Sequence, residues 1–78
     1  NQIFFAYGTN VQTFNMRIYD RWGLNIFESN DIKQGWDGEY MGRMVQSDVY
    51  VWKIKFEVET EAGTLEEHYR VGTVTVVR

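Results

Sequence analysis

The chain has 78 residues, a net charge of −3 and no cysteine, and 17% of its residues are aromatic. A chain of this length forms one small domain, whose core depends on a few large side chains. Its eight basic residues are scattered, whereas nucleic-acid binding needs a basic patch, and no apolar run is long enough for a membrane-spanning helix. Without cysteine there is no disulfide and no cysteine-based metal site. We therefore expect neither nucleic-acid binding nor membrane insertion.

The first half of the chain alternates between apolar and polar residues, as half-buried strands do. Residues 3–5 predict a short opening strand, and residues 14–18 predict a longer one. The residues that share the inner face of the longer strand are Phe14, Met16 and Ile18. Residues 20–23 then predict a tight hairpin with a bulged turn, because they end in glycine, and residues 24–27 resume the strand pattern.

A polar loop over residues 29–35 leads to Trp36, Asp37 and Gly38. Asp-Gly is a frequent tight-turn pair, and Met41-Gly42 allows a second bend. If Trp36 lay on an exposed loop, its flat ring would instead be a platform on which a sugar ring stacks. We prefer the structural interpretation, in which the indole fills the core and Asp37-Gly38 makes the turn.

The second half predicts the longest strand over residues 48–59, a hairpin over 61–64 and a return strand over 65–77. The inner face of the longest strand is formed by Tyr50, Trp52, Ile54, Phe56 and Val58. For the return strand we expect the inner residues to be Leu65, Glu67, Tyr69 and Val71, followed by Val74 and Val76. A bulge at Gly72 would produce this change of face. The whole pattern predicts an antiparallel β-sandwich of about six or seven short strands.

Residues that could carry out chemistry are not grouped in the sequence. The single histidine, His68, has no nearby serine or cysteine nucleophile, and we expect it to be an exposed strand residue. Glu66 and Glu67 are adjacent on a strand, so they point to opposite faces and cannot act on one glycosidic bond. The acidic residues that could bind calcium are too dispersed; they are Asp20, Asp31, Asp37 and Glu39. We expect no enzyme activity, no cofactor and no metal.

Five blocks, in order along the chain, carry a resemblance to a known family. They are Asn1 to Phe4, Phe14 to Gly23, Trp36 to Gly38, Val49 to Trp52, and Gly72 to Arg78. Together they resemble the C-terminal sorting domain of gliding-motility and adhesin-type proteins that the type IX secretion system of Bacteroidetes exports. The chain departs from the family pattern at Asp20, where asparagine is frequent, and at residues 46–48, where a proline-containing turn is common.

The resemblance implies an immunoglobulin-like β-sandwich, with residues 1–78 as a single domain cut from the end of a larger exported protein. It implies a non-enzymatic signal that protein components of the type IX outer-membrane translocation machinery recognise in its folded form. The attached protein would reach the cell surface or the extracellular medium. The first strand of the family unit would precede Asn1. An unpaired sheet edge would then favour a strand-paired or swapped dimer of the isolated domain.

Two of the blocks contain the candidate recognition residues. The predicted hairpin contributes Arg21, Trp22 and Gly23, and the terminal strand contributes Gly72, Thr73, Val74, Thr75, Val76, Val77 and Arg78. We expect the Trp22 ring to close one end of the core, because a small domain needs apolar area. Arg21 either pairs within the fold or faces a partner. The terminal strand completes a sheet and is also suited to recognition through main-chain pairing at an edge.

Two other functions remain open. One is a carbohydrate- or ligand-binding module that uses Trp22, Trp36 or Trp52. The other is a structural immunoglobulin-like spacer in an adhesin or appendage, because the chain also resembles a domain of flagellar hook-capping proteins.

Overall fold

The computed structural model describes Phe4 and residues 10–77. Their strands are β1 (Val11–Tyr19), β2 (Asn25–Ser29), β3 (Glu39–Tyr40), β4 (Arg43–Met44), β5 (Asp48–Glu59) and β6 (Leu65–Val76). Every pairing between these strands is antiparallel. The described residues contain no helix, and thus none that could cross a membrane. The predicted all-β antiparallel class is confirmed.

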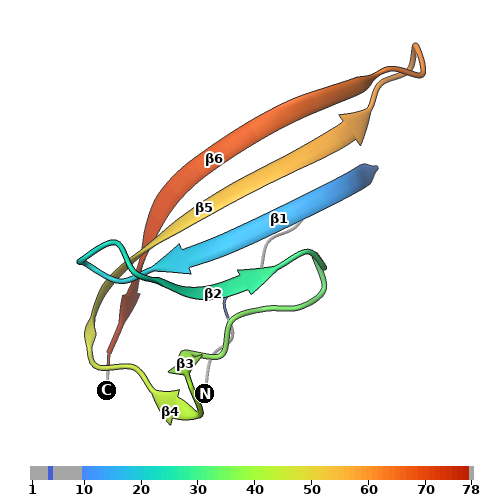
Figure 1. Ribbon diagram of the computed structural model, residues 1–78. Helices are drawn as coiled ribbons and strands as arrows, with labels where there is room; N and C mark the ends of the chain where they lie inside the picture. Colours follow the sequence, from blue (N-terminus) through green and yellow to red (C-terminus); the bar gives the residue numbers. More distant parts are fainter. Residues whose placement is uncertain (1–3, 5–9, 78) are drawn as a thin grey trace.

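Four of the strands form one curved sheet in the order β2-β1-β5-β6, and β3 and β4 form a separate two-stranded ribbon (Figure 1). The β5–β6 hairpin extends past β1 at one end of the molecule (Figure 1). Of the predicted opening strand over residues 3–5, the described part is Phe4, which makes an antiparallel bridge with Trp36. This arrangement of a sheet and a ribbon is compatible with the predicted immunoglobulin-like sandwich.

The core lies on the face of the sheet that the alternation predicted. Its buried apolar residues are Phe14, Met16, Ile18, Ile26, Trp36, Tyr50 and Ile54. Trp36 comes from the loop between β2 and β3, and only 2% of it is exposed. Its ring meets the Tyr50 ring edge-on at 5.4 Å, and its Nε1 donates a hydrogen bond of 3.0 Å to the carbonyl of Glu39. The indole therefore covers the sheet from the loop side, with its polar atom satisfied.

Two tight turns shape the segment from Trp36 to β4. The Asp37 carboxylate accepts a 3.1 Å hydrogen bond from the Glu39 amide, and the next residue, Gly38, has φ of 84°. Met41 and Gly42, with φ of 52° and 79°, then join β3 to β4. Positive φ at both central residues is the mark of a type I′ hairpin turn. The second bend predicted from the sequence is thus present.

Tyr50 ties the connection before β5 to the sheet. Its hydroxyl donates a 2.8 Å hydrogen bond to the carbonyl of Gln46, four residues earlier in the chain. A tyrosine that bonds back to the backbone just upstream of its strand is a recurrent feature of immunoglobulin-type sandwiches. This bond fixes how the chain enters β5.

The sequence prediction for β6 was wrong about its inner face. The pairing of β5 with β6 runs from Asp48↔Val76 to Glu59↔Leu65 without any shift, so there is no bulge at Gly72. The residues expected inside the first half of β6, namely Leu65, Glu67, Tyr69 and Val71, are exposed. Because register with β5 decides the face, the even-numbered residues of β6 lie on the inner side instead.

His68 also differs from expectation, for the same reason. It lies opposite Phe56 in the register, and the two rings stack at 5.2 Å. Its Nε2 is 2.9 Å from the Glu66 carboxylate, on the same face of β6. The histidine is therefore half-buried against an aromatic ring and is not a fully exposed strand residue.

Charged and aromatic side chains lie together on the outer face of the sheet. The Lys53 ammonium lies 5.1 Å from the centre of the Tyr19 ring, a cation–π contact. A hydrogen bond to Tyr19 and the charge of the Glu28 carboxylate raise the pKa of Arg17, which stays a fixed cation at physiological pH. The outer face is thus a solvated surface of mixed charge.

Candidate functional site

The candidate hairpin is a turn organised by one aspartate. The Asp20 amide donates to the Leu24 carbonyl at 3.0 Å, and the Gly23 amide donates to the Asp20 carbonyl at 3.1 Å. The Asp20 carboxylate accepts hydrogen bonds from the Trp22 and Leu24 amides, both at 2.9 Å. Gly23 has φ of 86°, and the β1–β2 pairing is irregular next to Tyr19, so the predicted bulged hairpin is present.

The turn between β5 and β6 has the same construction. The Thr60 amide donates a hydrogen bond of 2.8 Å to the Thr64 carbonyl, and the Gly63 amide donates one of 2.9 Å to the Thr60 carbonyl. Gly63 has φ of 81°. The two tip residues are Arg21 and Trp22 in the β1–β2 turn, and Glu61 and Ala62 in the β5–β6 turn. The backbone geometry of this turn therefore does not require an arginine or a tryptophan at its tip.

Trp22 is exposed, which corrects the expectation that its ring closes the core. Its exposed fraction is 74%, whereas Trp36 is almost completely buried and provides the indole of the core. The Arg21 guanidinium lies 5.3 Å from the centre of the Trp22 ring. The ring is thus held by a cation–π contact at the tip of a turn that projects from the sheet.

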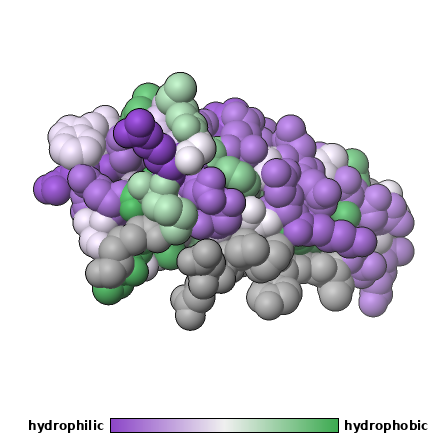
Figure 2. All heavy atoms as spheres, turned by 90° about the horizontal axis from the view of Figure 1, so that it is seen from below, coloured by the Kyte–Doolittle hydropathy of each residue, from purple (hydrophilic) through white to green (hydrophobic). Residues whose placement is uncertain are grey.

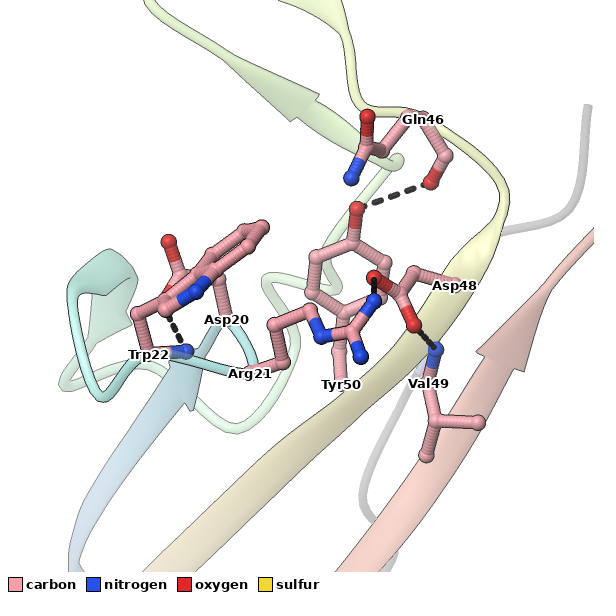
Figure 3. Close-up of polar contacts among 7 residues, drawn as sticks. All are labelled: Asp20, Arg21, Trp22, Gln46, Asp48, Val49 and Tyr50. Atoms are coloured by element: carbon pink, nitrogen blue, oxygen red, sulfur yellow. Dashed lines mark hydrogen bonds and ion pairs between the residues drawn. The ribbon is translucent and has the colours of Figure 1, made fainter.

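Arg21 is also bound to the start of β5. Its Nη1 lies 3.4 Å from Oδ2 of Asp48, whose side chain is 19% exposed, and Oδ1 of Asp48 accepts a 2.8 Å hydrogen bond from the Val49 amide (Figure 3). Arg21 extends from the turn towards Asp48, with Trp22 beside it (Figure 3). Arg21 therefore has a partner within the fold, and its position also supports the exposed ring.

Asp48 connects the two groups of candidate residues. It lies directly opposite Val76, and Val49 lies opposite Thr75. The Arg21–Asp48 pair therefore places the β1–β2 turn and the end of β6 at the same end of the molecule (Figure 1). Sequence reasoning missed Asp48, since an acidic residue at a strand start has no distinctive pattern. Arg78 lies outside the described residues.

On the face seen in Figure 2, hydrophobic residues are more frequent at this end of the molecule. Seen from below, they form several separate groups towards the end with the β1–β2 turn, while the end with the β5–β6 turn is mostly hydrophilic (Figure 2). Val77, just beyond β6, is 82% exposed.

Gly72 has a defined structural role in the terminal strand. It lies opposite Trp52, and a Cβ at position 72 would lie 2.6 Å from the ring atom Cε2 and closer still to Cζ2. The indole therefore crosses β6 at the one residue without a side chain. Beyond Gly72 its Nε1 donates a 3.2 Å hydrogen bond to the carbonyl of Thr73. Val74 and Val76 pack against the core, whereas Thr73 and Thr75 are exposed.

The acidic residues considered for calcium do not form a site in the part of the chain that the structure describes, where no three His, Asp or Glu side chains gather to hold a metal. An exposed indole and an accessible strand end are instead features of protein-recognition surfaces.

Comparison with known families identifies the chain. Residues 1–75 match the family described as CHU_C type IX secretion signal domain. The match covers nearly the whole chain, so the chain belongs to this family, as the resemblance implied. Neither the curated proteins nor the solved structures contain a significant match. The chain is therefore a sorting signal that interacts with the type IX secretion machinery and directs export across the outer membrane.

Proposed function

We propose that the domain acts without catalysis, as a folded label on a larger exported protein. Components of the type IX translocation machinery bind the label, and the attached protein passes to the cell surface or the extracellular medium. The family match supports export as the role. The convergence of the β1–β2 turn and the end of β6 at Asp48 supports recognition of the folded form, because residues 21 and 76 meet there only after folding.

Recognition centres on Trp22 in this proposal. An exposed indole is costly for a small domain, and the β5–β6 turn has the same backbone with alanine at that place. Tryptophan and arginine are the residues most enriched among those that dominate binding energy. Arg21 and Asp48 reduce the freedom of the ring before binding, which lowers the entropic cost of association.

The carbohydrate alternative is less well supported. Trp36 is buried, and the Trp52 ring lies across Gly72 with its Nε1 bonded to Thr73. Of the three tryptophans, Trp22 alone is largely exposed, and a single indole at a turn tip is not the flat platform that was considered from the sequence. A passive spacer would need neither an exposed indole nor its support by Arg21.

The test exchanges the tips of the two turns. In a fusion to a passenger protein in a type IX-competent cell, Arg21→Glu combined with Trp22→Ala gives the β1–β2 turn the tip of the β5–β6 turn. The exchange also replaces the Arg21–Asp48 pair by two carboxylates, so Trp22→Ala alone, which keeps the pair, is tested beside it. We expect both variants to fold and the exported fraction of each to fall about tenfold or more, as loss of a dominant binding residue does. The matched control is Glu61→Arg with Ala62→Trp, which should leave export unchanged. Normal export of the first variant would refute recognition through Trp22.

A further inference from the structure

The outer edge of β6 is the longest open edge in the part of the chain that the structure describes. β6 has 12 residues and ends the strand order β2-β1-β5-β6, whereas β2 at the opposite edge has five. An open edge presents main-chain donors and acceptors that a further strand can use. Two features decide which part of this edge can accept another strand. They are the residues of the edge and the side chains that already bond to its main-chain groups.

Successive residues of β6 direct their main-chain N–H and C=O groups alternately towards β5 and towards the open edge. The register with β5 shows which residues do which. Thr60 and Thr64 form a hydrogen-bonded pair, and the register continues from there without a shift. Because bonded and non-bonded pairs alternate in antiparallel sheets, the even-numbered residues of β6 bond to β5. The odd-numbered residues point their N–H and C=O groups outward; they are Leu65, Glu67, Tyr69, Val71, Thr73 and Thr75.

Two outward carbonyls are already occupied by side chains of the domain itself. The Arg70 guanidinium donates a 2.8 Å hydrogen bond to the carbonyl of Tyr69 and lies over the Phe56 ring, and Trp52 Nε1 donates to the carbonyl of Thr73. These bonds protect the middle of the edge. The outward N–H and C=O groups of Thr75 lie beyond both of these bonded carbonyls, close to Asp48 and the β1–β2 turn.

The distribution of charge also distinguishes the two halves of this edge. The half of β6 near the β5–β6 turn contains Glu66, Glu67 and Arg70, and charged residues discourage pairing with another strand. Residues 71–77 contain no charge and are valine, threonine and one glycine. β-Branched residues without charge favour strand addition. Val74 and Val76 lie on the core side of this segment, and Thr73 and Thr75 lie on the other side.

We infer that the segment 71–77 receives an extended, uncharged and β-branched segment of the secretion component that recognises the domain, which joins the sheet as a fifth strand. This inference rests on the proposed export function and adds to it the chemistry of the partner. The added strand continues the core side with apolar residues next to Val74 and Val76. Its main-chain bonds converge on the outward groups of Thr75.

A separate protein fits this edge better than a second copy of the chain. The seven residues 71–77 span about 23 Å, with the Thr73 carbonyl already bonded to Trp52, and a stable interface buries about 800 Å² on each partner. A strand alone is therefore a small contact. The same end carries the exposed Trp22, so a partner that supplies both a strand and an apolar pocket reaches a stable size. The strand-paired dimer expected from the sequence is the competing occupant.

The experiment removes single outward N–H groups with proline. Proline is tolerated in an edge strand where its nitrogen faces away from the sheet, so Thr75→Pro blocks the added strand and keeps the bonds to β5. Thr75→Val removes the hydroxyl and keeps the N–H. Glu67→Pro is the matched control, since it removes an outward N–H from the charged half. In the passenger fusion we expect Thr75→Pro to reduce export about tenfold or more and both other variants to export normally.

Folding and oligomeric state complete the test. Thermal unfolding of each purified variant shows whether it is folded; if Thr75→Pro does not fold, Val77→Pro replaces it, because Val77 lies beyond the end of β6. If the folded proline variant is exported normally and the Trp22 variant is not exported, strand addition is refuted and the sorting function stands. Normal export of all variants refutes the recognition proposal as well. A dimer by light scattering that Thr75→Pro converts to monomer assigns the edge to a second copy and overturns the inference.

Discussion

The Trp52 indole lies across Gly72 of the neighbouring strand, in the space that any other residue would fill with its Cβ. The ring reaches over β6 to the carbonyl of Thr73 on the outer edge. One contact thus joins β5 to β6, satisfies the indole N–H and protects part of an open edge. It explains the glycine in the terminal strand, which the sequence alone had suggested to be a bulge.

The first prediction tests this contact. Gly72→Ala places a methyl group against the ring, and we expect a loss of about 1 to 3 kcal/mol in the free energy of unfolding, as for overpacked cores. Chemical denaturation measures the change. In a Trp52→Leu background the same substitution should cost less, because the ring is gone. An equal cost in both backgrounds would contradict the role assigned to Trp52.

A second prediction concerns the bond from Tyr50 to Gln46. Tyr50→Phe removes the hydroxyl that donates to the Gln46 carbonyl, and we expect a loss of about 1 to 2 kcal/mol in the free energy of unfolding. The control is Tyr69→Phe, at an exposed ring on the outer face, which should change stability by less than about 0.5 kcal/mol. Equal effects of the two substitutions would show that the bond does not hold the entry to β5.

A third prediction separates charge from hydrogen bonding at Asp20. Oδ1 of its carboxylate accepts two amide hydrogen bonds, and the side-chain oxygen of an asparagine has two lone pairs that can accept both. Asp20→Asn should therefore change the free energy of unfolding by less than about 0.5 kcal/mol, whereas Asp20→Ala should lower it by about 1 to 2 kcal/mol. Denaturation curves of the two variants decide this. A large loss in the asparagine variant would mean that the charge itself holds the turn.

A fourth prediction is a stabilising substitution. Met41 has φ of 52° and is 84% exposed, so a residue that disfavours positive φ occupies a turn without being buried. Asn-Gly is the preferred pair for this turn type. Met41→Asn should raise the free energy of unfolding by about 1 kcal/mol, a rise of about 4 to 8 °C in Tm for a domain of this size. Met41→Leu keeps the conformational cost and should give no such gain; a similar rise for both would contradict the explanation.

Local patterns in the sequence determined much of the fold. Alternation placed Phe14, Met16 and Ile18 on the inner face, and glycine marked the turns at Gly23 and Gly63. These features depend on side-chain period and on the φ that a residue tolerates, both of which are properties of short segments. The ordered blocks also identified the family correctly.

Tertiary structure decided what depends on distant partners. The inner face of β6 follows from its register with β5, so His68 lies against Phe56 while Leu65 and Tyr69 are exposed. Alternation alone cannot distinguish two faces that both contain apolar residues. Likewise, Trp36 filled the core from a loop and left Trp22 exposed, and Arg21 met Asp48 across 27 residues of chain. Such contacts are set by how the sheet curves and packs, which no short segment specifies.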